Sequence, residues 1–208
     1  MNQKLAIKGL YAITPDSADT PELLHRTRLV LSGGASVLQY RNKSADAALR
    51  LEQATALREL TREFSVSFIV NDDAQLAAQV DAEGVHLGKT DGELKAARAL
   101  LGAGKIIGIS CYNQLFLAKE AVAAGADYVA FGAFYPSTVK PYAVRVEIEL
   151  LRQARAQFAA PLVAIGGITV QNASALLEAG ADSLAVISAV FDADNCKVAA
   201  QDFSRFFI

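Results

Sequence analysis

The sequence predicts an α/β protein with a (β/α)8 TIM-barrel fold, formed as one domain over residues 1–208. Short apolar runs typical of strands alternate along the whole chain with longer segments of helical character. The pattern returns about every 26 residues, which is 208 divided by eight. Such alternation predicts parallel strands with right-handed crossovers, and eight units in a chain of about 200 residues are enough to close a barrel.

The expected strands follow one another at regular intervals. They span residues 10–14, 36–41, 67–72, 84–88, 106–110, 127–132, 162–167 and 183–188. Between them lie segments rich in Ala, Leu, Glu and Arg, such as residues 45–64, where Leu49, Ala56, Leu57 and Leu60 share one helical stripe. The similar turns SGGAS, AAGAD and EAGAD precede three of the strands and suit helix C-caps. An open doubly wound sheet is the alternative, but it would need a glycine-rich fingerprint after the first strand, where the chain reads PDSADT.

Composition and charge exclude several classes of function. With 52% apolar and 20% charged residues, the chain has the balance of an ordinary globular domain. A net charge of −2 argues against a broad basic surface for nucleic acid, and no apolar run approaches the roughly 18 residues that a membrane span needs. The first residues lack the layout of a secretory signal, so we expect a cytoplasmic protein. Cys111 and Cys196 lie far apart without metal-type spacing, so we expect two unpaired and unreactive thiols.

Polar side chains gather at the C-terminal ends of the expected strands, where barrels carry their chemistry. Gln39, Arg41 and Lys43 alternate with other residues at the end of the second strand, so an extended chain places all three on one face. Burying an amide, a guanidinium and an ammonium without partners is costly, so we expect this face to meet an anionic ligand. Asn71 and Ser110 end the third and fifth strands at the same rim.

Two carboxylates predict a divalent cation site. Asp72 and Asp91 are separated by 19 residues (91 minus 72), about one unit, and therefore belong to neighbouring loops. Oxygen ligands suit Mg²⁺, which often shares substrate phosphates. Asp73 is instead expected to cap the helix that follows it.

Two further regions suggest ligand binding. Gly166 and Gly167 end the seventh strand, where glycine lets backbone amides approach a phosphate, although a tight turn alone is the other interpretation. The loop 133–143 contains two prolines and Lys140, which is typical of a substrate lid. His86 is expected to be a hydrogen-bonded interior residue rather than a catalytic group, and Cys111 has no neighbouring base that would activate it.

The ordered set of motifs resembles the thiamine-phosphate synthase family, also called thiamine-phosphate pyrophosphorylase. The resemblance covers nearly the whole chain. It rests on LYAIT, Q-x-R-x-K at 39–43, VNDD at 70–73, GVHLG-x-x-D ending at Asp91, GIS ending at Ser110, YPSTVK, IGGI and VIS. It implies a single catalytic domain, a transferase that joins hydroxymethylpyrimidine diphosphate to thiazole phosphate and releases pyrophosphate, with Mg²⁺ as cofactor.

The same resemblance implies a role for each matching residue. It implies that the pyrimidine diphosphate contacts Gln39, Tyr40, Arg41, Asn42, Lys43, Asn71, Ser110 and Lys140. It implies that the thiazole phosphate contacts Ser137, Thr138, Val139, Gly167, Ile187 and Ser188. Mg²⁺ would bind Asp72 and Asp91, and catalysis would depend on Arg41, Lys43, Ser110 and Lys140.

The expected mechanism is a dissociative substitution. Departure of the diphosphate leaves a cation that the pyrimidine amino group stabilises, so the enzyme mainly has to neutralise the leaving group and needs no strong general base. Two positions depart from the family pattern: Lys89 stands where glutamine is usual, and Ser137 and Val139 stand where threonine is usual. Val139 removes a hydroxyl that could contact the thiazole phosphate.

Three other functions compete with this interpretation. A thiazole tautomerase relative would share the barrel without making the coupled product, and a non-catalytic protein would only bind thiamine precursors. An isomerase-type phosphate barrel would need an acid/base pair at the mouth. Small molecules are the expected partners, nucleic acid and membranes are not, and a homo-oligomer is left open.

Overall fold

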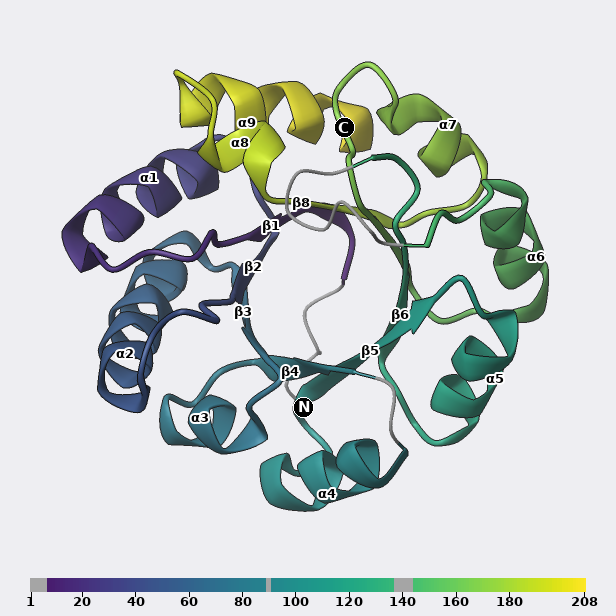
Figure 1. Ribbon diagram of the computed structural model, residues 1–208, viewed down its shortest axis with the longest axis horizontal. Helices are drawn as coiled ribbons and strands as arrows, with labels where there is room; N and C mark the ends of the chain where they lie inside the picture. Colours follow the sequence, from purple (N-terminus) through teal and green to yellow (C-terminus); the bar gives the residue numbers. More distant parts are fainter. Residues whose placement is uncertain (1–6, 89–90, 137–143) are drawn as a thin grey trace.

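Parallel strands close into one barrel ringed by helices in the computed structural model, which describes residues 7–88, 91–136 and 144–208 (Figure 1). Each described strand pairs in parallel with its neighbours, and β1 closes the barrel by pairing with β8, Leu10 opposite Leu184. The strands are β1 (Gly9–Ile13), β2 (Val37–Tyr40), β3 (Ser67–Asn71), β4 (Gly84–Leu87), β5 (Ile106–Tyr112), β6 (Tyr128–Phe131), β7 (Leu162–Ile165) and β8 (Ser183–Val186). The expected (β/α)8 TIM barrel is confirmed.

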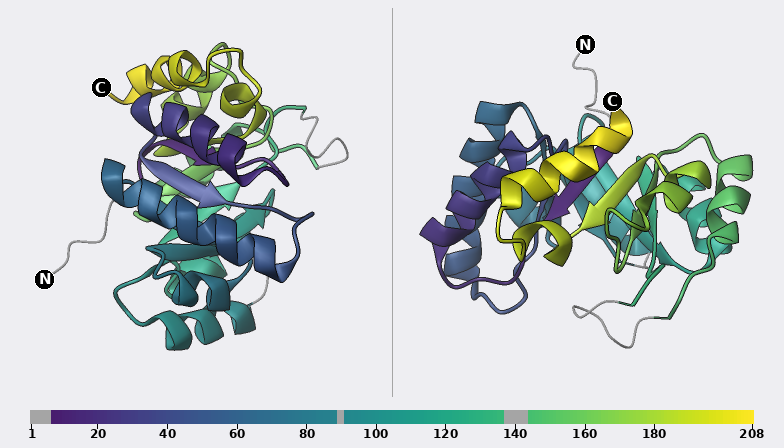
Figure 2. Two further views of the ribbon diagram at one scale, coloured as in Figure 1. Left: turned by 90° about the vertical axis from the view of Figure 1, so that its left-hand side faces the viewer. Right: turned by 90° about the horizontal axis from the view of Figure 1, so that it is seen from above.

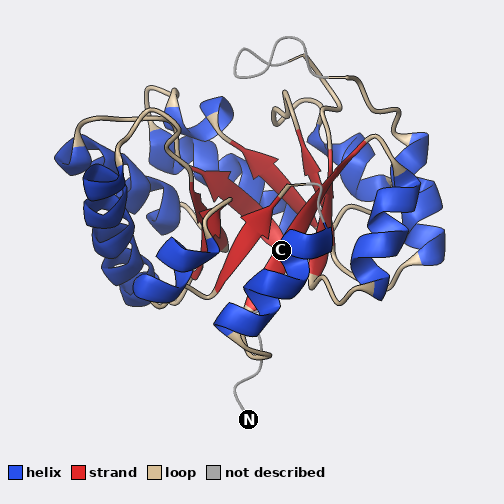
Figure 3. Cartoon of the chain, turned by 60° about the horizontal axis from the view of Figure 1, so that its bottom comes forward, coloured by secondary structure: helices blue, strands red, loops and turns tan. Residues whose placement is uncertain are grey.

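The helices form a shell around the strands (Figure 3). They are α1 (Thr20–Ser32), α2 (Ala47–Phe64), α3 (Ala74–Gln79), α4 (Asp91–Leu101), α5 (Leu115–Ala123), α6 (Glu149–Gln157), α7 (Ala173–Glu178), α8 (Ser188–Phe191) and α9 (Cys196–Ser204), with a 3-10 turn η1 (Arg205–Phe207) after them. The C-terminal α9 lies beside α1 (Figure 2), so the last α-helix of the chain packs against the first. No helix in the described ranges combines the length and the apolar character that crossing a bilayer demands.

Alternation along the strands builds two apolar layers. In β2, Leu38 and Tyr40 pack outward into the layer between strands and helices, while Val37 packs inward. The inner layer consists of Ile7, Tyr11, Ile13, Val37, Ile69, Ile106, Tyr128, Ala130, Val163 and Ala185. A filled interior of this kind is a packed core, so ligands have access only at the ends of the barrel.

Local sequence signals set the ends of several helices. Asp19, Asp46, Asp73 and Asn195 each precede a helix and accept a hydrogen bond from the backbone N–H three residues on. The expected capping role of Asp73, which accepts from Leu76 N at 2.8 Å, is confirmed. The last glycine of each repeated turn has a positive φ, as helix C-termini favour: Gly34, Gly125 and Gly180.

The strand ends differ slightly from those expected. The second strand covers 37–40 rather than 36–41, and the fifth continues past Ser110 to Tyr112. The pairing of β5 with β6 shifts register between Ser110 and Tyr112, and Tyr112 has φ +53°. An irregularity of this kind re-aims side chains at a barrel rim, and periodicity alone does not reveal it.

A repeated ion pair fixes the opposite, N-terminal end of the barrel. The pairs, with their N–O distances, are Arg58–Glu83 at 2.6 Å, Arg98–Asp127 at 2.5 Å and Arg155–Asp182 at 2.5 Å. Each acid also accepts a backbone N–H at the start of the preceding strand, from Phe68, Ile107 and Leu162 respectively. Each pair therefore ties a helix to two neighbouring strands.

Candidate functional site

A cavity of about 600 Å³ opens at the C-terminal ends of the strands. Its floor is formed by interior side chains such as Tyr11 and Tyr128, and its walls come from the ends of strands and the loops after them. The predicted site residues that line it are Gln39, Arg41, Lys43, Asn71, Asp72, Ser110, Gly167, Ile187 and Ser188. We call this space the central cavity.

The polar face predicted after β2 lies in the central cavity. Gln39 is only 3% exposed, and Arg41 and Lys43 follow it toward the rim. The three side chains share one face, as their spacing predicts. A guanidinium and an ammonium beside a buried amide give this side of the cavity affinity for anions.

Tyr40 and Asn42 point elsewhere. The Tyr40 hydroxyl donates to Gln53 Oε1 at 3.0 Å, on the side of α2. Asn42 is buried, and its Nδ2 donates to Ser17 O and Gln53 Oε1 while its Oδ1 accepts from the loop that starts α2. The polar atoms of both side chains are therefore engaged in holding the loop after β2. The predicted contacts of Tyr40 and Asn42 with substrate stay predictions.

A chain of buried hydrogen bonds crosses the barrel beneath the cavity. Gln39 Nε2 donates to the Tyr11 hydroxyl at 2.9 Å, and the Tyr11 and Tyr128 hydroxyls are 2.8 Å apart. His86 Nδ1 lies 2.9 Å from the Tyr128 hydroxyl, and His86 Nε2 lies 2.8 Å from Ser110 Oγ. We call this set the interior chain. It joins β2, β1, β6, β4 and β5 and connects two predicted substrate contacts, Gln39 and Ser110.

Burial determines the protonation of this chain. Removal from water raises the pKa of the Tyr11 and Tyr128 hydroxyls well above the usual range. The hydroxyls therefore stay neutral and act as hydrogen-bond relays. The tyrosine rings also lie 6.0 Å apart, edge to face, and His86 stacks on Tyr128 at 5.6 Å.

Only part of this chain was predicted from the sequence. His86 is a hydrogen-bonded interior residue, as expected, but it holds Ser110 rather than merely filling space. Tyr11 and Tyr128 were not predicted. Strand alternation could have placed both rings inside the barrel, because residues two apart in a strand point to the same side. Tyr11 is two residues from Ile13, Tyr128 is two residues from Ala130, and all four face inward.

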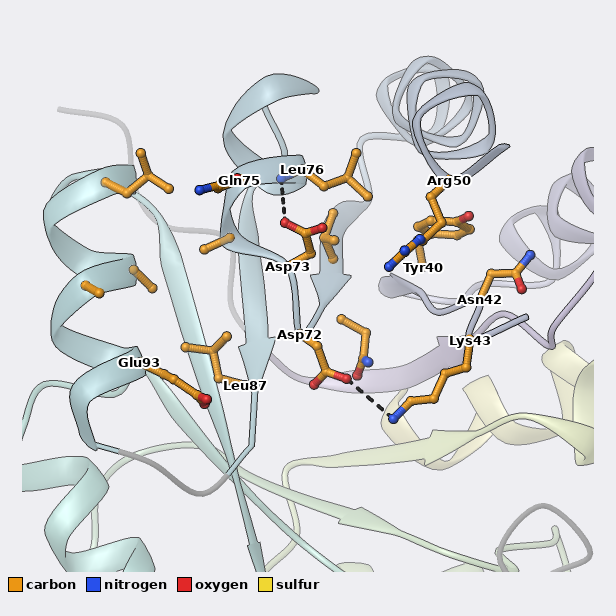
Figure 4. A pocket seen from close by; sticks show the side chains of 16 residues that line it. Tyr40, Asn42, Lys43, Arg50, Asp72, Asp73, Gln75, Leu76, Leu87 and Glu93 are labelled. Atoms are coloured by element: carbon orange, nitrogen blue, oxygen red, sulfur yellow. Dashed lines mark hydrogen bonds and ion pairs between the residues drawn. The ribbon is translucent and has the colours of Figure 1, made fainter. Parts of the chain in front are cut away.

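The carboxylate expected to bind metal lies on the rim. Asp72 follows β3 with φ +62°, and its N–H donates to His86 O at 2.8 Å. Its Oδ2 lies 3.5 Å from Lys43 Nζ, and Figure 4 shows these two side chains pointing toward each other. Asp91 is the first residue of α4, and its side chain falls outside what the structure describes. Among the described side chains, no group of three or more His, Cys, Asp or Glu residues is placed to hold a metal.

Another cavity, of about 660 Å³, lies beside the first, between α2, α3 and α4 (Figure 4). It shares Lys43, Asn71 and Asp72 with the central cavity. The Lys43–Asp72 pair therefore stands between the two spaces.

The predicted phosphate region lies at the ends of β7 and β8, on the other side of β1 from β2. Gly167 has φ +62°, and a Cβ there would lie 2.2 Å from Pro136 O, so the chain passes too closely for a side chain. Ile187 and Ser188 follow β8 into the same cavity. Residues Ser137, Thr138, Val139 and Lys140 of the expected lid, and Lys89, lie outside the described residues.

Neither cysteine belongs to the site. Both are buried free thiols, as expected. Burial raises the pKa of Cys111 to about 12, so its thiolate is scarce at neutral pH.

Comparison with known proteins points to one family. The sequence profile described as thiamine monophosphate synthase matches residues 10–190. The chain is 53% identical over 201 residues to a thiamine-phosphate synthase of Methylobacillus flagellatus, covering 97% of this chain and 96% of the relative. It is 51% identical over 199 residues to the thiamine-phosphate synthase of Thiobacillus denitrificans, covering 96% and 94%.

Solved structures agree. Thiamine phosphate pyrophosphorylase from Pyrococcus furiosus superposes with a TM-score of 0.84 at 36% identity, over 97% of this chain and 95% of that one. A 3-hexulose-6-phosphate synthase superposes with a TM-score of 0.70 at 17% identity, covering 94% and 98%, which shows a common fold alone.

Proposed function

Because the chain belongs to the thiamine monophosphate synthase family, we propose that it makes thiamine phosphate with the side chains gathered around the central cavity. It is a transferase of thiamine biosynthesis, a thiamine-phosphate synthase that couples hydroxymethylpyrimidine diphosphate with thiazole phosphate and releases pyrophosphate. The observation that carries the site assignment is that Gln39, Arg41, Lys43, Asn71 and Ser110 line one cavity. We propose that residues 1–208 act as one catalytic domain.

The diphosphate would bind on the β2 side of the cavity. Arg41 and Lys43 lie next to each other there, and Arg41 offers planar N–H donors that match phosphate oxygens. As the bond to the pyrimidine methylene breaks, negative charge accumulates on the leaving diphosphate, and fixed cations stabilise that charge. Lys140, predicted from the sequence, would add a third cation.

Mg²⁺ fits the donor set at this rim. Asp72 presents carboxylate oxygens beside Lys43, and hard oxygen ligands are those that Mg²⁺ prefers. Asp72 and Asp91 would hold the ion, which when bound supplies positive charge to the diphosphate oxygens. Two carboxylates leave room for phosphate oxygens and water in the coordination shell.

The pyrimidine would lie over the interior chain. Gln39 and Ser110 are held at fixed positions by hydrogen bonds to Tyr11 and His86, so they need little reorganisation to orient a ring. Asn71 lines the same cavity and offers a further hydrogen-bonding group. With the ring fixed, the methylene would face the second substrate at the ends of β7 and β8.

The thiazole phosphate would bind at the ends of β7 and β8. The loop at Gly167 and the chain at Ile187 and Ser188 line the cavity there, and their backbone N–H groups are the proposed donors to the phosphate. Residues 137–139 are predicted to contribute. The phosphate serves as a handle that brings the thiazole nitrogen to the methylene carbon.

Incubation with both precursors and Mg²⁺ tests the function directly. We expect thiamine phosphate by mass spectrometry and one equivalent of pyrophosphate, both lost in a chelator. Arg41→Ala should reduce turnover by about tenfold or more, since a hydrogen bond to a charged group is removed, whereas Arg28→Ala on the outer face of α1 should not. A tautomerase or a binding protein would release no pyrophosphate.

Two sequence predictions remain as proposals. The first is that the protein is cytoplasmic. The second leaves open whether the chain forms a homo-oligomer. The partners that the function requires are the two small-molecule substrates.

A further inference from the structure

We propose that Asp16 is a positioning residue, which holds the Arg41 guanidinium and the backbone of Lys43 in the arrangement that receives a diphosphate. The proposal rests on the proposed function in one respect, the role of Arg41 and Lys43 as diphosphate-binding cations. Asp16 belongs to the loop between β1 and α1, outside the motifs that pointed to the site.

One carboxylate oxygen contacts both cationic residues. Asp16 Oδ1 accepts from Arg41 Nη1 at 2.9 Å and from Lys43 N at 2.9 Å. The Asp16 side chain is 39% exposed and that of Arg41 16%, so the pair lies at the rim with its cationic member mostly enclosed. Asp16 is not among the described residues that line the central cavity, so it acts on Arg41 from behind.

The backbone of Arg41 is fixed by the same loop. Thr14 Oγ1 accepts from Arg41 N at 2.9 Å and donates to Arg41 O at 3.0 Å. Ser17 O accepts from Asn42 Nδ2 at 2.6 Å. The loop after β1 is therefore hydrogen-bonded to three consecutive residues of the loop after β2. Asp16 is the charged residue among those of the loop after β1 that make these hydrogen bonds.

The contact selects a rotamer without using up the ligand-binding capacity of the cation. A guanidinium has five N–H donors, and the bond to Asp16 engages one at Nη1. An arginine side chain that must be immobilised on binding loses rotamer freedom, which weakens affinity. A partly exposed ion pair adds little to folding stability. Its effect is therefore expected in ligand binding rather than in unfolding.

The test compares Asp16→Ala with Asp16→Asn. We measure binding of inorganic pyrophosphate with Mg²⁺ by titration calorimetry, and the kinetics with each substrate varied separately. Asp16→Ala should weaken pyrophosphate binding and raise the KM for pyrimidine diphosphate by about tenfold, because a charge-assisted hydrogen bond is lost, with the KM for thiazole phosphate unchanged. Asp16→Asn keeps an acceptor oxygen and should show a smaller loss.

Glu63→Ala is the matched control. It removes another arginine–carboxylate pair, Arg28–Glu63 at 2.6 Å, which lies on the outer helices. It should leave all of these constants unchanged. In an Arg41→Ala background, Asp16→Ala should add little further loss, since much of its effect acts through Arg41.

The outcomes separate this proposal from the proposed function. If the wild type makes no thiamine phosphate, the function is wrong, and the calorimetric comparison still tests Asp16. An active wild type with equal KM changes for both substrates, or with Asp16→Asn as impaired as Asp16→Ala, would overturn the positioning role. Unchanged pyrophosphate binding in Asp16→Ala would overturn it as well.

Discussion

The Tyr128 hydroxyl has two partners inside the barrel, the Tyr11 hydroxyl at 2.8 Å and His86 Nδ1 at 2.9 Å. Buried polar groups are tolerated only when they are paired, and here each described bond depends on the next. Such a network fixes the side chains of Gln39 and Ser110, which we propose orient the pyrimidine, and it is sensitive to the loss of any one member.

Replacing Tyr128 with Phe tests this dependence. The change deletes one oxygen and leaves the Tyr11 hydroxyl and His86 Nδ1 without that partner, so we expect the free energy of unfolding to fall by about 1–3 kcal/mol. Turnover should fall too, because Ser110 is then held less firmly. Urea unfolding and steady-state kinetics measure the two effects.

A control removes a hydroxyl elsewhere. Thr55 Oγ1 donates to Leu51 O on an exposed face of α2, so Thr55→Val should alter neither stability nor turnover appreciably. If Tyr128→Phe behaved like this control, the interior chain would have no role in holding the site.

At the scale of elements, β5 and β6 fit together through a glycine. A Cβ at Gly108 would lie 1.9 Å from Tyr128 Cζ, so the tyrosine ring occupies the space that a side chain on β5 would need. Glycine is normally unfavourable inside a strand, and here close approach of a ring explains it.

Gly108→Ala should therefore displace the Tyr128 ring or the strand. We expect a loss of about 1–3 kcal/mol in unfolding free energy, typical of overpacking, together with reduced turnover. Gly104→Ala is the matched control, since a Cβ there meets nothing within 4 Å. Equal stability of the two variants would show that the ring moves aside freely.

Elements whose signals are local could be predicted from the sequence. Capping by Asp73 and the positive φ at Gly125 and Gly180 follow from neighbouring residues alone. The contact between Gly108 and Tyr128 could not be predicted from the sequence, because the pairing of β5 with β6 brings these two residues together. The register shift at Ser110 belongs to the same class of information.

At the scale of the whole molecule, the arginine–acid pairs and the proposed site occupy opposite ends of the barrel. The arginine–acid pairs join helices to strand starts at the N-terminal end, while the central cavity lies at the C-terminal end. Barrels commonly divide their two faces in this way. Changes at the N-terminal end should therefore alter folding without altering catalysis.

Asp182→Ala tests this separation. The change removes the partner of Arg155 Nη2 and of the N–H of Leu162, which is a fully buried residue, and a buried donor left without a partner should cost about 1–3 kcal/mol in unfolding free energy. The KM for each substrate should stay unchanged. Glu149→Ala, which breaks an exposed pair with Arg152 within α6, should cost well under about 1 kcal/mol. A changed KM in Asp182→Ala would refute the separation.

The order of strands and the polar rim followed from the sequence because barrel topology brings every strand end to one mouth. That rule is enough to place Gln39, Arg41 and Lys43 around one cavity. That rule did not predict the roles of Asp16 and Tyr11. Asp16 lies on a loop with no periodicity, and Tyr11 resembles an ordinary core aromatic in sequence, because only the fold brings its hydroxyl to Tyr128.

The interior chain also has a direction. An amide nitrogen only donates, so the Tyr11 hydroxyl accepts from Gln39, which leaves its own hydrogen available to donate to Tyr128. In the order that this donation favours, Tyr128 donates to His86 Nδ1 and the imidazole proton lies on Nε2, facing Ser110 Oγ. We expect nitrogen NMR to report this Nε2–H tautomer, and a proton on Nδ1 would contradict the order. In that order Ser110 accepts from His86 and keeps its own hydrogen to donate into the central cavity, so a single amide on β2 would set the polarity of this contact.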